Sequence, residues 1–215
     1  IIPNGIGNDF ASYWELDEDD YKKSVDWIIN RRLRKIDVGR VGYTDGDVCG
    51  TRYFINAMYI GLGARFVWIS NGTRRFWGMQ WLSFLSSMFL LLFERKLHRM
   101  HLKVNGEHIR DKIMTVCIGS ARGYGLTPSA VPYNGWLDVS VVYRPELLQL
   151  FKGLWLLVNG RLLNLKKVVK PYRTKKVKIL RAQNAAISLD GRQMYKECPL
   201  DVRIMPEAMT LIIPE

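Results

Sequence analysis

Short runs of β-forming residues separated by tight-turn signals dominate this chain after residue 98. Asn105-Gly106, Asn134-Gly135 and Asp190-Gly191 favour turns, because Asn, Asp and Gly tolerate the positive φ angles that tight turns require. The runs that these turns separate cover residues 99–104, 113–119, 136–143, 175–181, 185–189, 200–205 and 209–213. Strands at such short spacing predict a β-sandwich or a β-barrel.

The remaining elements predicted are helices and one hairpin. Residues 19–32 carry apolar side chains at helical spacing, which predicts a helix. Residues 34–43 and 51–60 are rich in Val, Ile and Tyr, and a Thr-Asp-Gly-Asp turn signal at residues 44–47 predicts a hairpin between them. A second apolar helix is predicted over Leu147–Val158, preceded by Pro and Glu.

The most apolar stretch is Phe76–Phe93, and its 18 residues leave three interpretations open. Gln80, Ser83 and Ser87 follow one side of a helix, and the aromatic side chains follow another, which indicates an amphipathic helix. We expect a core helix. A membrane-touching helix and a true span are the alternatives, although 18 residues are at the short limit for a span.

The charge balance favours an anionic partner. The net charge is +12, and residues 147–189 contain no Asp or Glu. The basic side chains of this tract are Lys152, Arg161, Lys166, Lys167, Lys170, Arg173, Lys175, Lys176, Lys178 and Arg181. The tract is consistent with a solvated face, with a face for acidic phospholipid, or with nucleic-acid binding, but no stacking pattern of aromatic residues supports the last.

Cysteine and histidine give no sign of a metal site or of a disulfide framework. Cys49, Cys117 and Cys198 are far apart and odd in number, which is typical of reduced thiols in a cytosolic protein. The three histidines at positions 98, 101 and 108 cluster around one predicted strand, with no cysteine nearby, and we interpret them as surface residues of that strand.

Three segments are candidates for chemistry. Residues 3–11, PNGIGNDFA, follow what we interpret as the end of a buried strand, and their glycines and capping residues are typical of a phosphate-binding turn or of an ordinary strand-to-helix turn. Residues 119–138 form a glycine-rich loop, either at a cleft or without chemistry, and they end on Asp138, a carboxylate in an apolar strand that needs a partner such as a cation. Asp190-Gly191-Arg192 is typical of a hairpin turn.

Taken in order, these segments resemble the diacylglycerol kinase catalytic-domain family, which includes bacterial lipid kinases and sphingosine kinases. The opening IIPNGIGNDFA resembles the family's P-x-G-T-x-N-D-F-A turn. RKIDVG at residues 34–39 resembles its iDxG strand start, and the segment 52–67 resembles its F-x-N-x-x-x-x-G strand. Residues 119–139 resemble its glycine-rich segment, and residues 188–209 resemble its closing D-G-E and P-x-A motifs.

The resemblance implies an α+β protein of two domains that uses ATP. Residues 1–33 would be a remnant of an α/β nucleotide-binding domain, and residues 34–205 a mainly antiparallel, β-sandwich-like second domain with flanking helices. Residues 206–215 would return to the first domain. The family transfers the γ-phosphate of ATP, with Mg²⁺, to a lipid hydroxyl such as that of diacylglycerol or a sphingoid base.

The resemblance also assigns candidate site residues. The catalytic candidates are Asp9, Asp37 and Arg192. The nucleotide-binding candidates are Asn4, Gly5, Gly7, Asn8 and Asp190. The carbonyl of Trp136 and the carboxylate of Asp138 match positions that hold a structural Mg²⁺.

Several residues depart from the family pattern. Arg192 stands where the family has Glu, Ile6 where it has Thr, and Tyr133 and Asn134 where it has an acidic pair. Arg cannot act as a base, although it can hold phosphate. The family's GGDGT loop has no match, so we expect it to precede residue 1 and expect the chain alone to be inactive. A weak or silent kinase-like protein that binds lipid or nucleotide is therefore the alternative function.

The expected partners follow from charge and resemblance together. We expect a cytoplasmic protein that associates peripherally with an anionic membrane surface and binds a lipid acceptor. We expect no nucleic-acid partner, and a homodimer is left open.

Overall fold

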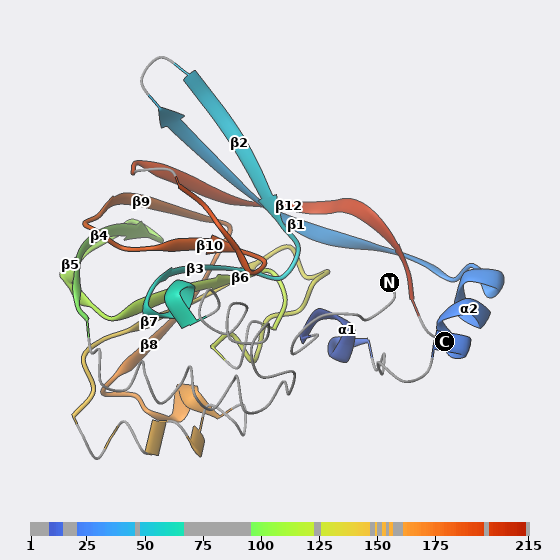
Figure 1. The fold of residues 1–215 in the computed structure, drawn as a ribbon, viewed down its shortest axis with the longest axis horizontal. Coiled ribbons are helices and arrows are strands. Elements are labelled where there is room, and N and C mark those ends of the chain that lie inside the picture. The colour runs from blue at the N-terminus through green and yellow to red at the C-terminus, as the bar shows by residue number, and fades with distance from the viewer. Residues whose placement is uncertain are drawn as a thin grey trace, which may run out of the picture.

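A computed structural model describes residues 9–14, 21–45, 48–66, 96–122, 126–146, 149, 152–153, 155–156, 161–195 and 198–213. Within these residues the chain forms two six-stranded antiparallel sheets that pack face to face (Figure 1). The prediction of a β-sandwich is therefore confirmed, and the barrel alternative is wrong. The apolar segment Phe76–Phe93 lies outside the described residues, so its three interpretations stay open.

The first sheet has the strand order β2-β1-β12-β9-β4-β5. Its strands are β1 (Leu33–Asp45), β2 (Val48–Phe54), β4 (His98–Val104), β5 (Glu107–Ile113), β9 (Lys176–Ala182) and β12 (Leu200–Ile212). β1 pairs with β2 and β4 with β5, as the predicted turn signals at residues 44–47 and 105–106 require. At the second turn Asn105 and Gly106 both have positive φ, 50° and 84°, as a tight hairpin requires.

The second sheet has the order β11-β10-β3-β6-β7-β8. Its strands are β3 (Ala57–Gly61), β6 (Thr115–Gly119), β7 (Leu137–Val142), β8 (Val169–Thr174), β10 (Ile187–Leu189) and β11 (Arg192–Gln193). Three neighbouring strands, β3, β6 and β7, are buried along their whole length. The centre of this sheet is therefore covered on both faces, whereas β4 in the first sheet alternates between buried and more exposed residues.

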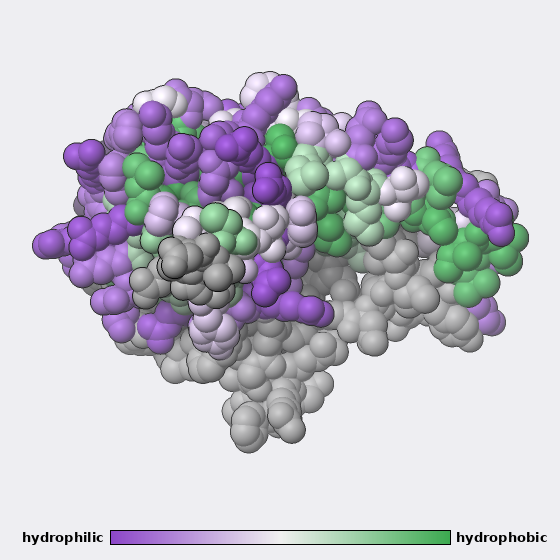
Figure 2. Space-filling model, turned by 90° about the horizontal axis from the view of Figure 1, so that it is seen from above, coloured by the Kyte–Doolittle hydropathy of each residue, from purple (hydrophilic) through white to green (hydrophobic). Residues whose placement is uncertain are grey.

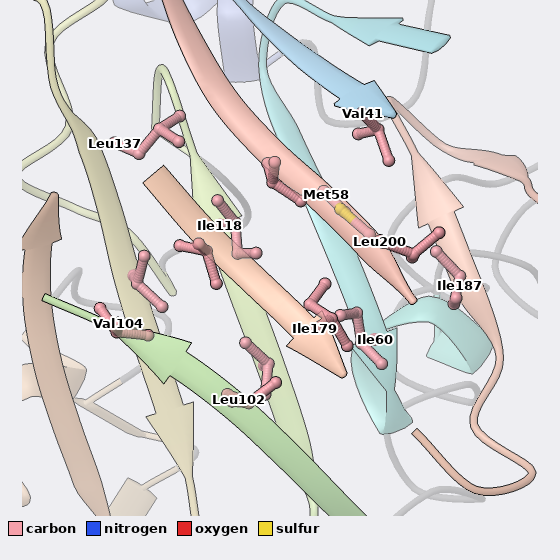
Figure 3. Packing of buried hydrophobic residues seen from close by; sticks show 14 of the residues in the cluster. Val41, Met58, Ile60, Leu102, Val104, Ile118, Leu137, Ile179, Ile187 and Leu200 are labelled. Atoms are coloured by element: carbon pink, nitrogen blue, oxygen red, sulfur yellow. The ribbon is translucent and has the colours of Figure 1, made fainter. Parts of the chain in front are cut away.

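The interior of the sandwich is filled by aliphatic side chains from both sheets (Figure 3). Strand β4 shows the reason most simply, since Met100, Leu102 and Val104 are buried and alternate with more exposed polar residues. A strand with this period of two places one face against the core and the other in solvent. The alternating sequence therefore determines which face of the first sheet points inward.

The sequence did not predict β5 and β8, each of which is one of the two edge strands of its sheet. Strand β5 is mostly charged, and β8 contains Pro171 and two basic residues. Charged residues and proline are common on edge strands, where they prevent pairing with another chain. Both strands therefore lack the Val- and Ile-rich pattern on which the prediction depended.

Two predicted runs are divided differently in the structure. Residues 51–60 form two strands in different sheets, because the chain leaves β2 and enters β3 at Ile55 and Asn56. Residues 200–205 and 209–213 belong to one long strand, β12, which pairs with β1 on both sides of an irregularity. At this bulge, Ile36 pairs with Met209 and Val38 with Met205, so three residues of β12 oppose Asp37 alone.

Two of the described helices lie to one side of the sandwich. Helix α1 (Asp9–Tyr13) and helix α2 (Tyr21–Asn30) lie near the outer ends of β1 and β12 (Figure 1), and a short 3-10 helix, η1, covers Leu162–Asn164. A second core under these ends contains Phe10, Trp14, Ile36 and Leu211. Among the described helices, none is long and apolar enough to cross a bilayer.

We predict that Gly39→Ala destabilises the protein. The added Cβ would lie 2.1 Å from Cζ of Phe54, whose side chain is only 1% exposed and cannot swing into solvent. Overpacking of this kind costs about 1–3 kcal/mol in the free energy of unfolding, which urea denaturation measures. The matched control is Gly42→Ala on the same strand, where the nearest atom would be 3.7 Å away. Equal losses in the two variants would contradict the packing argument.

A second prediction concerns acid sensitivity of the β4–β5 hairpin. Nε2 of His101 lies 2.9 Å from Nδ1 of His108 and accepts a hydrogen bond from Nε of Arg110. Partial burial, Arg110 and His108 lower the pKa of His101 below its ordinary 6.5. The folded state therefore binds a proton less readily than the unfolded state, so stability falls as the pH drops below 6.5.

Urea midpoints at neutral and mildly acidic pH test this prediction. The midpoint of the native protein should decrease on acidification, and His101→Gln should decrease less. An equal decrease in both proteins would exclude His101 as the cause.

Candidate functional site

Several connections meet at the end of the sandwich that lies nearest to α1 (Figure 1). They are the β2–β3 connection, the residues after β6, the loop that leads into β7, and the turn between β10 and β11. Ala121, just after β6, packs in the same core as Phe10 and Trp14. This end of the molecule therefore brings together most of the described segments to which the sequence assigned chemistry.

Asp190 joins the β10–β11 turn to the β2–β3 connection. Asp190 and Gly191 have φ angles of 44° and 82°, so the predicted tight hairpin turn is present. The Asp190 carboxylate accepts hydrogen bonds from the backbone N–H groups of Ile55, Asn56 and Ala57 at 2.7, 2.9 and 3.0 Å. Burial raises the pKa of this carboxyl, whereas the three donors and Arg192 act in the opposite direction. Both oxygens of Asp190 are thus engaged by backbone.

The same connection is held from its other side by the residues after β6. The backbone N–H groups of Ser120 and Ala121 donate to the carbonyl of Asn56 at 3.0 and 3.1 Å. The Ser120 hydroxyl donates to the carbonyl of Ile55 at 2.9 Å. The turn from one sheet to the other is therefore fixed by side chains and backbone of two distant segments.

Asp37 plays a corresponding part in the pair of strands β1 and β12. Its side chain is buried, and its two oxygens accept hydrogen bonds from N–H of Gly135 at 2.6 Å and N–H of Glu207 at 3.0 Å. Glu207 lies in the bulge of β12 with a positive φ of 52°, next to Pro206, which has no N–H. The carboxylate thus supplies the partner that the irregular backbone of the bulge lacks.

Aromatic and basic side chains surround α1. The hydroxyl of Tyr13 donates to that of Tyr133 at 2.9 Å, and burial with this bond raises the pKa of Tyr13 to about 12. The guanidinium of Arg34 lies 3.6 Å from the centre of the Tyr133 ring, and that of Arg122 lies 5.6 Å from the centre of the Tyr13 ring. Two cations therefore lie against aromatic rings near Tyr13, the last residue of α1.

Asp138, one of the two predicted Mg²⁺ ligands, already has a cationic partner in this arrangement. Nε and Nη2 of Arg173 donate to the two oxygens of Asp138 at 2.7 and 3.1 Å, in a bidentate pair. Nη2 also donates to the carbonyl of Ser129 at 3.3 Å. Nor do the described residues contain a cluster of three or more His, Cys, Asp or Glu side chains that could hold a metal ion. A guanidinium is thus the partner that the carboxylate requires.

The remaining predicted residues are only partly described. Asn4, Gly5, Gly7 and Asn8 lie outside the described residues, and Asp9 is the first residue of α1, without a described side chain. Arg192 is exposed on β11, directly after the turn that Asp190 and Gly191 form. The roles predicted for these residues stay predictions.

Sequence reasoning missed Arg34, Tyr13, Arg122 and Arg173 as members of this region. Arg173 belongs to the basic tract, where sequence gave no reason to separate it from its neighbours. Its role follows from the register of two strands, because Asp138 on β7 lies directly opposite Arg173 on β8. Cross-strand opposition of this kind is visible only once the pairing of the strands is known.

We predict that Asp37→Asn destabilises the fold and loosens the bulge. An amide has one acceptor oxygen, so either Gly135 or Glu207 would lose its buried partner, at a cost of about 1–3 kcal/mol. Urea denaturation should show the loss, and hydrogen exchange at these two amides should become faster. Glu207→Gln is the control, because the Glu207 side chain makes only an exposed ion pair with Lys35. Unchanged exchange at both amides in Asp37→Asn would contradict the role of this carboxylate.

Solved structures with a similar fold include two from Bacillus anthracis str. Sterne. One is provisionally named a diacylglycerol kinase, and it has a TM-score of 0.71 and 18% sequence identity to this chain. The match covers 99% of this chain and 67% of the solved chain. The other, a diacylglycerol kinase, has a TM-score of 0.63 and 14% sequence identity. Here the match covers 99% of this chain and 65% of the solved chain. This chain thus spans about two thirds of their length.

Yeast NADH kinase complexed with NADH is a more distant neighbour, with a TM-score of 0.50 and 10% sequence identity. The match covers 91% of this chain and 48% of the yeast chain. At such identities these likenesses show the fold alone. No curated protein matches the sequence. Residues 56–213, however, match the family described as the YegS C-terminal NAD kinase beta sandwich-like domain.

The family match and the diacylglycerol kinase neighbours confirm the resemblance predicted from the motifs. The match covers every strand from β3 to β12, which together belong to both sheets, and it covers well over half of the chain. The protein therefore belongs to the YegS C-terminal, NAD kinase beta sandwich-like family.

Proposed function

We propose that the protein is an ATP-dependent lipid kinase, which transfers the γ-phosphate of ATP to a lipid hydroxyl. One observation carries the proposal. Helix α1, Asp37, the loop into β7 and the Asp190-Gly191-Arg192 turn lie at the same end of the sandwich, although they are far apart in sequence. These are the segments that the resemblance assigns to nucleotide binding, to the reaction centre and to a structural Mg²⁺.

The described residues suggest how phosphate would be held. Arg34 and Arg122 are fixed beside α1 by the rings of Tyr133 and Tyr13, and Arg192 follows the anchored turn. Guanidinium groups bind phosphate oxygens strongly, and phosphoryl transfer depends on charge neutralisation and positioning. ATP would arrive with Mg²⁺ as part of the substrate complex.

Asp37 and Asp190 have a structural role beside the predicted catalytic and nucleotide-binding roles, which stay predictions. Asp37 accepts two backbone hydrogen bonds and Asp190 accepts three, so each carboxylate fixes the backbone of the segments around it. We assign them to holding the loops of the site in place. Asp9 is a further acidic candidate for contact with nucleotide or with the acceptor hydroxyl.

Phosphate transfer from labelled ATP tests the proposal. Full-length protein, γ-labelled ATP, Mg²⁺ and mixed micelles of diacylglycerol, monoacylglycerol or sphingoid acceptors are combined, and lipid products are separated and counted. We expect label in one acceptor class, with a loss of roughly 100-fold or more in Asp9→Ala if this residue acts directly in the transfer. Folded protein that labels no acceptor would refute the kinase proposal.

The alternative is a kinase-like protein that binds lipid or nucleotide without turnover. Two observations favour it, namely Arg192 at the family's Glu position and the engagement of Asp138 by Arg173. Arg192→Glu separates the two functions. A gain of activity from an inactive parent would support the alternative, whereas an active parent that loses activity on this change would exclude it.

Peripheral contact with a membrane is part of the proposed function, because a lipid acceptor resides in a bilayer. The net charge of +12 favours an anionic membrane surface. A cytoplasmic location and the division into domains at residues 33/34 and 205/206 stay predictions.

A further inference from the structure

The outer face of the first sheet carries three rows of basic side chains across β9, β4 and β5. Directly opposed residues in antiparallel strands lie on the same face, so the strand register defines the rows. The rows are Arg99 with Lys112; Arg181, His101 and Arg110; and Lys178, Lys103 and His108. We call these eight side chains the cationic face.

Like charges that are directly opposed across strands repel each other and destabilise a sheet. In the cationic face, Lys103 lies opposite Lys178 and Arg99 opposite Lys112, and none of the residues that β9, β4 and β5 contribute to the three rows is a carboxylate. Such an arrangement gains stability when an external anion neutralises it.

The nearest carboxylate in register does not neutralise the face. Asp201 on β12 lies opposite Lys178, but it accepts hydrogen bonds from Arg203 at 2.5 and 3.2 Å and pairs with Lys176 at 3.1 Å. Arg203 and Lys176 hold its pKa below the ordinary range. Asp201 is thus shared between two other cations.

Acidic residues on β5 are directed elsewhere as well. Glu107 pairs with Lys170 of the other sheet at 2.8 Å, and Asp111 lies opposite the buried Met100, not in a basic row. Figure 2, which views the molecule from above, shows mostly hydrophilic residues over the part where Figure 1 places β9, β4 and β5. The positive charge is therefore concentrated on an open surface.

We propose that this cationic face docks the protein onto an anionic phospholipid surface. Six Lys and Arg side chains on a broad sheet can contact several lipid headgroups at once, and each contributes to binding near a charged bilayer. The bulge in β9 adds the partly exposed Leu180 among these cations, where it can enter the interfacial region. The inference rests on the membrane contact in the proposed function and assigns it to a surface distinct from the candidate site, and vesicle binding can be measured without kinase activity.

A nucleic acid is the competing polyanion, and the composition of the face argues against it. Binding of single strands uses aromatic side chains on which bases stack, and the three rows contain no Phe, Tyr or Trp. The apolar Leu180 gains nothing from a phosphate backbone but does gain from a bilayer.

Sedimentation with vesicles tests the proposal on the full-length protein. The vesicles contain either phosphatidylcholine alone or phosphatidylcholine with about a third phosphatidylserine. The test variant is Lys103→Gln with Lys178→Gln. The matched control is Lys166→Gln with Lys167→Gln, which removes the same charge from exposed residues outside the cationic face.

We expect binding to the phosphatidylserine vesicles alone, weakened by salt. Each lysine contributes roughly fivefold, so the test variant should bind roughly 25-fold more weakly, while the control stays within about twofold of the native protein. Thermal melting should show no loss of stability in the test variant, because one pair of opposed like charges has been removed.

Three outcomes would overturn the proposal. Equal weakening in both double variants would mean that net charge, and not this face, determines binding. Failure of the native protein to bind phosphatidylserine vesicles at low salt would exclude the cationic face as a docking surface for anionic phospholipid. Tighter binding to duplex DNA or single-stranded RNA than to these vesicles would assign the face to nucleic acid.

Discussion

The long antiparallel pairing of β1 with β12 is the constraint on which the rest of the structure depends. These strands belong to the sandwich at one end and, at the other, continue to the second core beside α1 (Figure 1). The bulge between the two parts contains Pro206 and Glu207, and its unpaired N–H is bound by the buried carboxylate of Asp37. Asp37 also binds N–H of Gly135, so the same carboxylate sets the position of the loop that leads into β7.

Asp190 likewise binds unpaired backbone N–H groups, at the point where the chain passes from the first sheet to the second. Backbone groups that leave one strand and have not yet entered the next need other partners, and the three N–H groups of residues 55–57 find them in one carboxylate. Both aspartates therefore act on the candidate site through the backbone of its loops. A residue can thus belong to a functional motif because it shapes the site, without touching the reacting atoms.

The pairing of the strands, and not the order of residues in the chain, determines which charged side chains lie together. The basic tract of residues 147–189 supplies Arg173 to Asp138 and Lys170 to Glu107, while Lys178 and Arg181 join cations from β4 and β5 on the opposite sheet. One stretch of sequence therefore contributes to two surfaces with different chemistry. The resulting cationic face lies away from the candidate site, so binding to a surface and phosphate transfer involve separate groups of residues.

The sequence by itself determined the class of fold, the hairpin turns at residues 105–106 and 190–191, and the family, because φ preferences and period-two burial are local properties that each segment carries with it. It did not predict the edge strands β5 and β8, whose charges and proline hide the β pattern. Only the tertiary structure decided that Arg173 lies opposite Asp138, that Asp37 and Asp190 bind backbone, and which cations share a face. These relations depend on strand register between segments distant in sequence, and a local pattern contains no information about which residue stands opposite another.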